Sequence, residues 1–293
     1  MVEIIVPLND EGNVQLQLPE RLAGRSLALD LFAGNDPVRS INSGLRSLAK
    51  HLTALLDDLD AIDGIFDPNK VLVGKVLRSF EDVIYTTSEV FESYEKSLTK
   101  TIVALSSSTY KTRVRGYLSA VKRHRDDWTF LTNKLKHENN HLAPVAQKYT
   151  PSLRVVHGFS LIKPEGIDGL NVNKAFHKKR ERSRSYNLQL RQLIFDVLKV
   201  DSLAAALVDG IEEDNDATCL PHYSLNWSVG RQLERILQRP MWPLPEEPRT
   251  IDGFKLEKKL LRTERQVAAF IYEAGQARVE FEGDGVTTKF PII

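Results

Sequence analysis

The chain has 293 residues, of which 42% are hydrophobic and 27% are charged, and its formal net charge is +1. This length is sufficient for a substantial hydrophobic core, and the composition excludes the disordered and fibrous classes of protein. The small net charge excludes a strong field over the whole protein that would attract nucleic acid, although a local basic face is still allowed.

Two further exclusions concern cysteine chemistry and the membrane. Cys219 is the single cysteine, so an internal disulfide and a cysteine-based zinc site are both excluded. The start of the chain, MVEIIVPLNDEGN, is acidic within three residues and contains Pro7, unlike a signal peptide. No apolar run approaches the roughly 20 residues of a membrane span. We therefore expect a cytoplasmic protein that does not enter a membrane.

The first region, residues 1–36, has the composition of β structure. Val2–Val6 and Val14–Leu18 flank the turn-forming residues Asn9–Asn13 and are predicted to pair as a β-hairpin. The second of these runs alternates between apolar and polar residues, as a half-buried strand does. Leu27–Phe32 is a candidate third strand.

Residues 37–145 are predicted to form a helical bundle. Leucines at three- and four-residue steps predict a first amphipathic helix, and they are Leu45, Leu48, Leu52, Leu55, Leu56 and Leu59. An apolar stripe from Val73 to Leu105 predicts a long second helix. A third helix follows the polar loop Ser106–Ser108, and Pro144 is expected to end it. Two long helices joined by a short loop should pack as an antiparallel pair.

Residues 146–240 are predicted to pack on this bundle. Leu153–Ile162 and Leu170–Asn173 bracket a turn-forming segment and should pair as a β-hairpin. The elements expected after it are the helix Leu188–Leu207, the acidic loop Asp209–Thr218 and the short helix Val229–Leu237.

The last region, residues 241–293, is predicted to contain one helix and one hairpin. The helix is expected over Leu256–Ala274, and the strands Ala277–Glu282 and Val286–Ile292 flank an Asp-Gly turn. The proline-rich stretch 240–248 is the best candidate for a domain boundary, although all four regions can also form one domain. The predicted fold class is mainly α (α+β), a long helical pair or bundle with added β-hairpins.

The stretch Asn133–His141 carries the first of two catalytic patterns. His137-Glu138-x-x-His141 matches the HExxH pattern of zinc hydrolases. On a continuous helix, histidines four residues apart share a face and can hold Zn²⁺, while Glu138 acts as the base toward a zinc-bound water. In the extended form of this pattern a third histidine stands six residues after the second, but Gln147 occupies that position. We therefore expect a site without metal or cofactor, with a Zn site as the alternative.

The second pattern concerns the polar residues of the same helix end. Asn133, His137 and His141 recur at steps of four, which predicts that they share one side of the helix, with Lys136 beside them. A histidine there can act as general acid or base toward an RNA 2′-hydroxyl, while the amide and the ammonium steady the phosphate. The candidate catalytic residues are therefore His137, Asn133, His141 and Lys136.

The helix pair that ends in Leu131–His137 resembles the HEPN superfamily, whose signature is Arg-polar-x-x-x-His at the end of a long helix. The resemblance covers residues 70–145. Asn133 matches the polar position and His137 the catalytic histidine, whereas Thr132 stands where the family has its arginine. The resemblance implies RNA binding or metal-independent ribonuclease activity, in a prokaryotic defence or toxin system. It also implies a homodimer in which two copies of the helix face each other.

Two other interpretations stay open at the level of sequence. The basic run His177–Arg184 can contact a phosphate backbone through Lys178, Lys179, Arg180 and Arg182, or it can be a solvated loop. The polar residues at the helix end can satisfy terminal carbonyl groups instead of doing chemistry. In that case the chain would be a non-catalytic scaffold that binds a protein partner.

Overall fold

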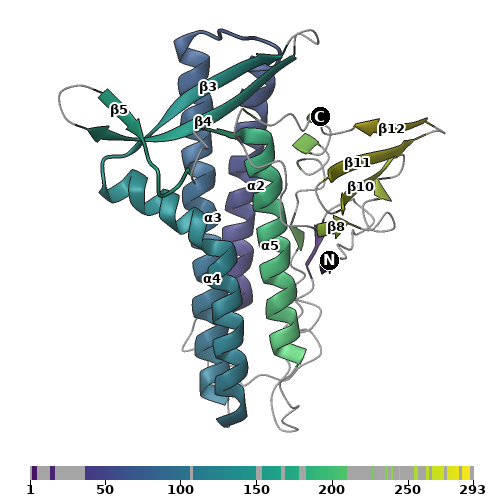
Figure 1. Ribbon diagram of the computed structural model, residues 1–293. Helices are drawn as coiled ribbons and strands as arrows, with labels where there is room; N and C mark the ends of the chain where they lie inside the picture. Colours follow the sequence, from purple (N-terminus) through teal and green to yellow (C-terminus); the bar gives the residue numbers. More distant parts are fainter. Residues whose placement is uncertain are drawn as a thin grey trace.

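A computed structural model shows a bundle of long helices with strands gathered at its upper end and along one side (Figure 1). The residues that the structure describes are 2–4, 14–16, 37–105, 108–149, 154–165, 169–177, 183–209, 226–227, 232, 235, 236, 239, 244, 254–256, 262–263, 266–273, 276–283 and 286–290.

Four long helices build the bundle. They are α2 (Pro37–Ile62), α3 (Lys70–Leu105), α4 (Ser108–His137) and α5 (Tyr186–Asp209). α2 packs on α3, α3 packs on α4, and α4 packs on α5, so α3 and α4 are the expected helical pair. The prediction of a mainly α fold is confirmed.

The corner between α2 and α3 shows why these helices end where they do. Gly64 adopts a φ of 72°, which is strained for residues with a side chain, and it turns the chain after α2. The Asn69 side chain then accepts hydrogen bonds of 3.0 Å from the backbone N–H groups of Val71 and Leu72. This is an N-cap that satisfies two of the free donors of α3.

The leucine stripe of α2 and the apolar stripe of α3 meet in a single hydrophobic core. Phe80 of α3 is fully buried and contacts two aromatic rings from later in the chain, Phe159 at 4.7 Å and Tyr186 at 5.0 Å between ring centroids. The same core includes Leu16 and Ile236. The regions expected at 37–145 and 146–240 therefore share one core.

A small antiparallel sheet closes the upper end of the bundle (Figure 1). Its strands are β3 (His141–Tyr149), β4 (Arg154–Glu165), β5 (Gly169–Val172) and β6 (Arg184–Ser185), and β3, β5 and β6 all pair with β4. The β4–β5 pair is the predicted hairpin. β3 was not predicted, and Pro144 lies within it instead of ending a helix. Proline is tolerated there because β3 is an outer strand of the sheet.

The predicted N-terminal hairpin is wrong. β1 (Val2–Ile4) pairs in parallel with β8 (Phe254–Leu256), and β2 (Val14–Gln15) pairs with β7 (Asn226–Trp227). Both partners come from more than 200 residues later in the chain. A local turn composition cannot reveal such pairing, because the partner of a short strand depends on the tertiary fold.

The helix predicted over Leu256–Ala274 is also wrong, whereas the hairpin after it is confirmed. The C-terminal strands are β9 (Arg262–Thr263), β10 (Gln266–Glu273), β11 (Gln276–Gly283) and β12 (Val286–Phe290). They form one antiparallel sheet in the order β12, β11, β10, β9. The centre of β10, Phe270-Ile271-Tyr272, is rich in residues that favour strands, and it pairs directly with β11. Short apolar runs of this kind do not separate helix from strand by periodicity alone.

Some predicted elements lie partly or wholly outside the described residues. The expected strand Leu27–Phe32, the turn Asn9–Asn13 and residues 210–218 of the acidic loop belong to this group. Within the predicted helix Val229–Leu237, the three described residues, at 232, 235 and 236, are helical. Among the described helices, none is long and apolar enough to cross a membrane.

Gly158 is a position where a side chain cannot be accommodated. A Cβ there would lie 2.2 Å from the backbone oxygen of Arg184, because β6 approaches β4 at this point. We expect Gly158→Ala to lower the free energy of unfolding by about 3 kcal/mol, since the backbone of β6 must move. Urea denaturation would measure this change.

The matched control is Gly116→Ala in α4. A Cβ at Gly116 meets nothing within 4 Å, and the residue lies inside a helix. In this variant the free energy of unfolding should rise by about 1 kcal/mol, because alanine is a better helix former than glycine. Equal stability of the two alanine variants would contradict the close packing of β6 on β4.

Candidate functional site

The stretch Asn133–His141 does not form one continuous helix. α4 ends at His137, and Asn139 adopts the left-handed conformation with a φ of 53°. The backbone N–H groups of Glu138 and Asn140 both donate to the Lys134 carbonyl, at 3.3 and 3.2 Å. The prediction that His137 and His141 share a helical face is therefore wrong, because His141 is the first residue of β3.

The other candidate residues stay together at the end of α4. Asn133, Lys136 and His137 are all solvent-exposed, and the Lys136 ammonium lies 4.6 Å from the centre of the Tyr85 ring. Thr132 is buried, and its hydroxyl has no hydrogen-bond partner in the described structure. The position that corresponds to the arginine of the HEPN signature thus faces the interior.

The two histidines of the alternative zinc site also lie on different elements, because His137 ends α4 and His141 begins β3. Glu138 is exposed and forms an ion pair with Lys134, one helical turn earlier. Within the part of the chain that the structure describes, no three His, Cys, Asp or Glu side chains lie close enough to hold a metal ion. The described residues therefore do not supply the third protein ligand of a hydrolytic zinc site.

Asn140 connects the end of α4 to the small sheet, a role that the sequence did not reveal. Its side-chain amide donates to the Glu138 carbonyl at 3.0 Å, and its oxygen accepts a bond of 2.9 Å from Asn173. Asn173 in turn donates its backbone N–H to Leu161 of β4 at 2.8 Å. Both asparagines are buried. For Asn140, this network agrees with the interpretation that polar residues at the helix end serve packing. His137 is not part of the network and remains exposed.

His177, the first residue of the predicted basic run, is a buried structural residue. Its Nε2 accepts a hydrogen bond of 2.8 Å from the Leu161 N–H, while its Nδ1 has no partner in the described structure. Burial and the nearby Arg184 charge lower the pKa of His177 to about 4. Lys178, Lys179, Arg180 and Arg182, the predicted phosphate contacts, lie outside the described residues.

Arg184, at the other end of this run, is also used within the fold. Its guanidinium lies 4.0 Å from the centre of the Phe176 ring and bonds Asp127 of α4 at 3.2 Å. It is therefore held against the protein rather than presented to solvent.

Among the four long helices, α4 carries the largest net charge. This helix contains eight Lys or Arg and two Asp, a net charge of +6. In contrast, α2 has three basic and three acidic residues, α3 has five of each, and α5 has two basic and three acidic residues. Among these four helices, the excess of positive charge therefore lies on α4.

Exposed polar residues line one side of α4. We name as the basic face the exposed residues Arg115, Lys122, Arg123, Asn133, Lys136 and His137. At 100° per residue they fall within an arc of about 140°. The exposed Asp126 lies within the same arc and is its one acidic member among the described residues. The sequence predicted only Asn133, Lys136 and His137 at one end of this face and not its extension toward Arg115.

The cations of the basic face differ from other basic residues of α4 in their ion-pair partners. Arg125 is turned toward α3 and forms an ion pair with Glu95. For Arg115, Lys122 and Arg123, no acidic partner within ion-pair distance occurs among the described residues. These three cations are consequently presented to solvent.

A buried carboxylate on α5 holds α4 in this orientation. Asp196 accepts hydrogen bonds from Trp128 at 3.0 Å and from Gln192 at 2.8 Å, and it contacts His124 Nδ1 at 2.9 Å. Burial raises the pKa of Asp196, although its three partners favour the charged form and lower it. His124 and Trp128 project from α4 toward α5, so the opposite side of α4 is the one exposed.

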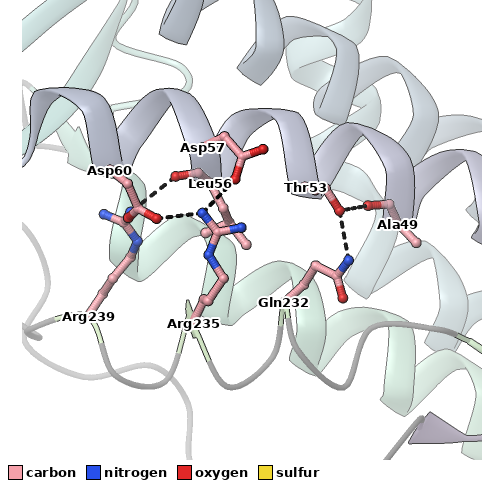
Figure 2. Close-up of polar contacts among 8 residues, drawn as sticks. All are labelled: Ala49, Thr53, Leu56, Asp57, Asp60, Gln232, Arg235 and Arg239. Carbon is pink, nitrogen blue, oxygen red and sulfur yellow. Dashed lines mark hydrogen bonds and ion pairs between the residues drawn. The ribbon is translucent and has the colours of Figure 1, made fainter.

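Acidic residues on α2, in contrast, are covered from within the chain (Figure 2). Arg235 bonds Asp57 at 2.8 Å and Asp60 at 2.5 Å, and Arg239 forms a further ion pair with Asp60. Gln232 donates to Thr53 at 2.7 Å one turn away. This acidic cluster thus binds the segment around residue 235 and is not an open site for a cation.

No family model matches this chain, and no solved structure matches it.

The buried His177 should make stability depend on pH. Its folded pKa of about 4 is below the unfolded value of 6.5, so the unfolded chain binds the extra proton as the pH falls between these values. Stability from this group is complete above pH 6.5 and is lost toward pH 4. Between pH 7 and pH 5 the loss should be about 2 kcal/mol.

Urea denaturation of the wild type and of His177→Gln at both pH values measures this contribution. The glutamine oxygen can still accept the Leu161 N–H bond but does not titrate. The variant should therefore show a pH dependence smaller by about 2 kcal/mol. An unchanged pH dependence would show that His177 is not held neutral in the folded protein.

Proposed function

We propose that this protein binds RNA along the basic face of α4, and that His137 at the end of this face serves metal-independent cleavage of the bound strand. The observation that carries the proposal is the net charge of +6 on α4, together with the exposed Arg115, Lys122 and Arg123, which have no acidic partner among the described residues. The resemblance to the HEPN superfamily in Asn133 and His137 agrees with RNA as the nucleic acid.

Electrostatics explains how such a face would bind. Each cation that neutralises a phosphate releases a condensed counterion, and this release drives binding that weakens with salt. Arg115 and Lys136 are separated by about 32 Å along the helix, so several phosphates can be contacted at once. Asp126 interrupts the face and weakens the field at its centre.

The end of the face supplies the groups for chemistry. Asn133 lies one turn before His137 on the same side of α4, and Lys136 is adjacent. An exposed imidazole can take the proton of a 2′-hydroxyl, while the amide and the ammonium contact the phosphate. Thr132, which stands at the position of the family's arginine, is buried. Lys136, the basic residue nearest to His137 in the sequence, would therefore supply the cation for the phosphate.

Charge reversal at the centre of the face tests binding. We expect the double variant Lys122→Glu/Arg123→Glu to bind RNA at least about tenfold more weakly at moderate salt, because two attractive contacts become repulsive. Fluorescence anisotropy with a labelled RNA would measure this loss. The matched control is Arg46→Glu/Lys50→Glu, which reverses two exposed charges on α2. Equal losses of RNA affinity in both double variants would show that only the net charge of the protein matters, which would contradict binding at a specific face.

Substitution of His137 tests cleavage. If His137 is the acid or base, His137→Ala should lower the cleavage rate by about 100-fold or more, while binding is kept. Cleavage should also persist in the presence of a metal chelator. His141→Ala is the control, because this residue lies on β3 and not on the basic face. RNA binding without any cleavage in the wild type would leave a non-catalytic RNA-binding protein.

A further inference from the structure

We infer that the basic face of α4 takes double-stranded RNA, held through its phosphates and without reading of the base sequence. The inference rests on the proposed function and names the substrate class of that same face. Two observations carry it, namely the placement of the aromatic residues of α4 and the outward, uncovered position of the face.

Of the aromatic side chains of α4 that the structure describes, Tyr117 and Trp128 are turned away from the basic face, whereas Phe130 falls within its arc but is partly covered by neighbouring side chains. Trp128 and Tyr117 are buried in the core, and Trp128 donates its N–H to Asp196. Phe130 is half-buried and stacks on Phe176, with the Lys134 ammonium 5.0 Å from its ring centre. Proteins that bind single strands stack successive bases on exposed aromatic rings. Among the described residues, no fully exposed aromatic ring lies in the arc of the basic face, because Phe130 is half-buried between Phe176 and Lys134.

The shape of the site favours a duplex as well. Single strands are held in charged grooves that follow the backbone. The basic face is instead the outer side of a helix whose opposite side packs on α3 and α5. The pocket of about 180 Å³ among Ile62, Pro144 and Tyr186 takes none of its lining residues from α4. A protruding helix can lie across the exposed backbones of a duplex, where no groove in the protein is needed.

The side chains present match contact with phosphates. Double-stranded RNA has a deep, narrow major groove that side chains cannot read, so it is recognised by shape, phosphates and 2′-hydroxyl groups. Arg115, Lys122, Arg123 and Lys136 are long cations suited to phosphates, and they occupy most of the face. Asn133 and His137 lie beside Lys136 and can bond 2′-hydroxyl groups at one end.

The test compares four labelled ligands on the full chain by fluorescence anisotropy. They are two 24-base-pair RNA duplexes of unrelated sequence, an unstructured single-stranded RNA of equal length, and a DNA duplex. We expect the two RNA duplexes to bind within about twofold of each other and about tenfold more tightly than the single strand. With four cations in contact, log K should fall against log salt with a slope of about −3.6. Lys122→Glu/Arg123→Glu should flatten this slope by about half.

Each other outcome counts against a defined part of the proposal. Tighter binding of the single strand, or a large difference between the two RNA duplexes, would overturn the inference while the proposed function stands. Tighter binding of the DNA duplex would overturn the assignment to RNA. Absence of binding to every ligand would overturn the proposed function itself.

Discussion

The buried carboxylate of Asp196 sets the rotation of α4, and the exposed surface follows from it. A carboxylate in the interior is tolerated only when its oxygens are hydrogen-bonded, and here Trp128, Gln192 and His124 supply the partners. Removal of one partner from such a group costs on the order of 3 kcal/mol, so rotation of α4 about its axis is opposed. The helix must therefore present the opposite side, with Lys122 and Arg123, to solvent.

The end of α4 is determined by a second set of polar contacts. The left-handed conformation of Asn139 reverses the chain, and Asn140 joins the helix end to Asn173 and through it to β4. Residues of the stretch Asn133–His141 therefore have different roles, although they are close together in the sequence. His137 remains exposed on the helix, Asn140 is structural, and His141 begins a strand. The HExxH spacing presupposes a helix that this turn does not allow.

Periodicity predicted the helices well, because each has to bury one apolar face against a neighbour. The leucines of α2 and the stripe of α3 were found in this way, and Phe80 and Leu52 are fully buried as expected. The same method failed for β10, whose short apolar run fits either a helix or a strand. It also failed for β1, because the partner of that strand is β8, far away in the sequence. For the candidate site, His137, Asn133 and Lys136 were found together, whereas the extension of the face to Arg115 was not.

The amino-acid sequence by itself determined the long helices, the hairpins β4–β5 and β11–β12, and the polar character of the end of α4. These features depend on residues that are close in the chain, through apolar spacing, turn chemistry and helix caps. Only the tertiary structure decided which basic residues face solvent, that Asn139 ends the motif helix, and that Asp57 and Asp60 are covered by Arg235. The physical reason is that burial and ion pairing depend on segments that are distant in sequence, and these meet only when the core has formed.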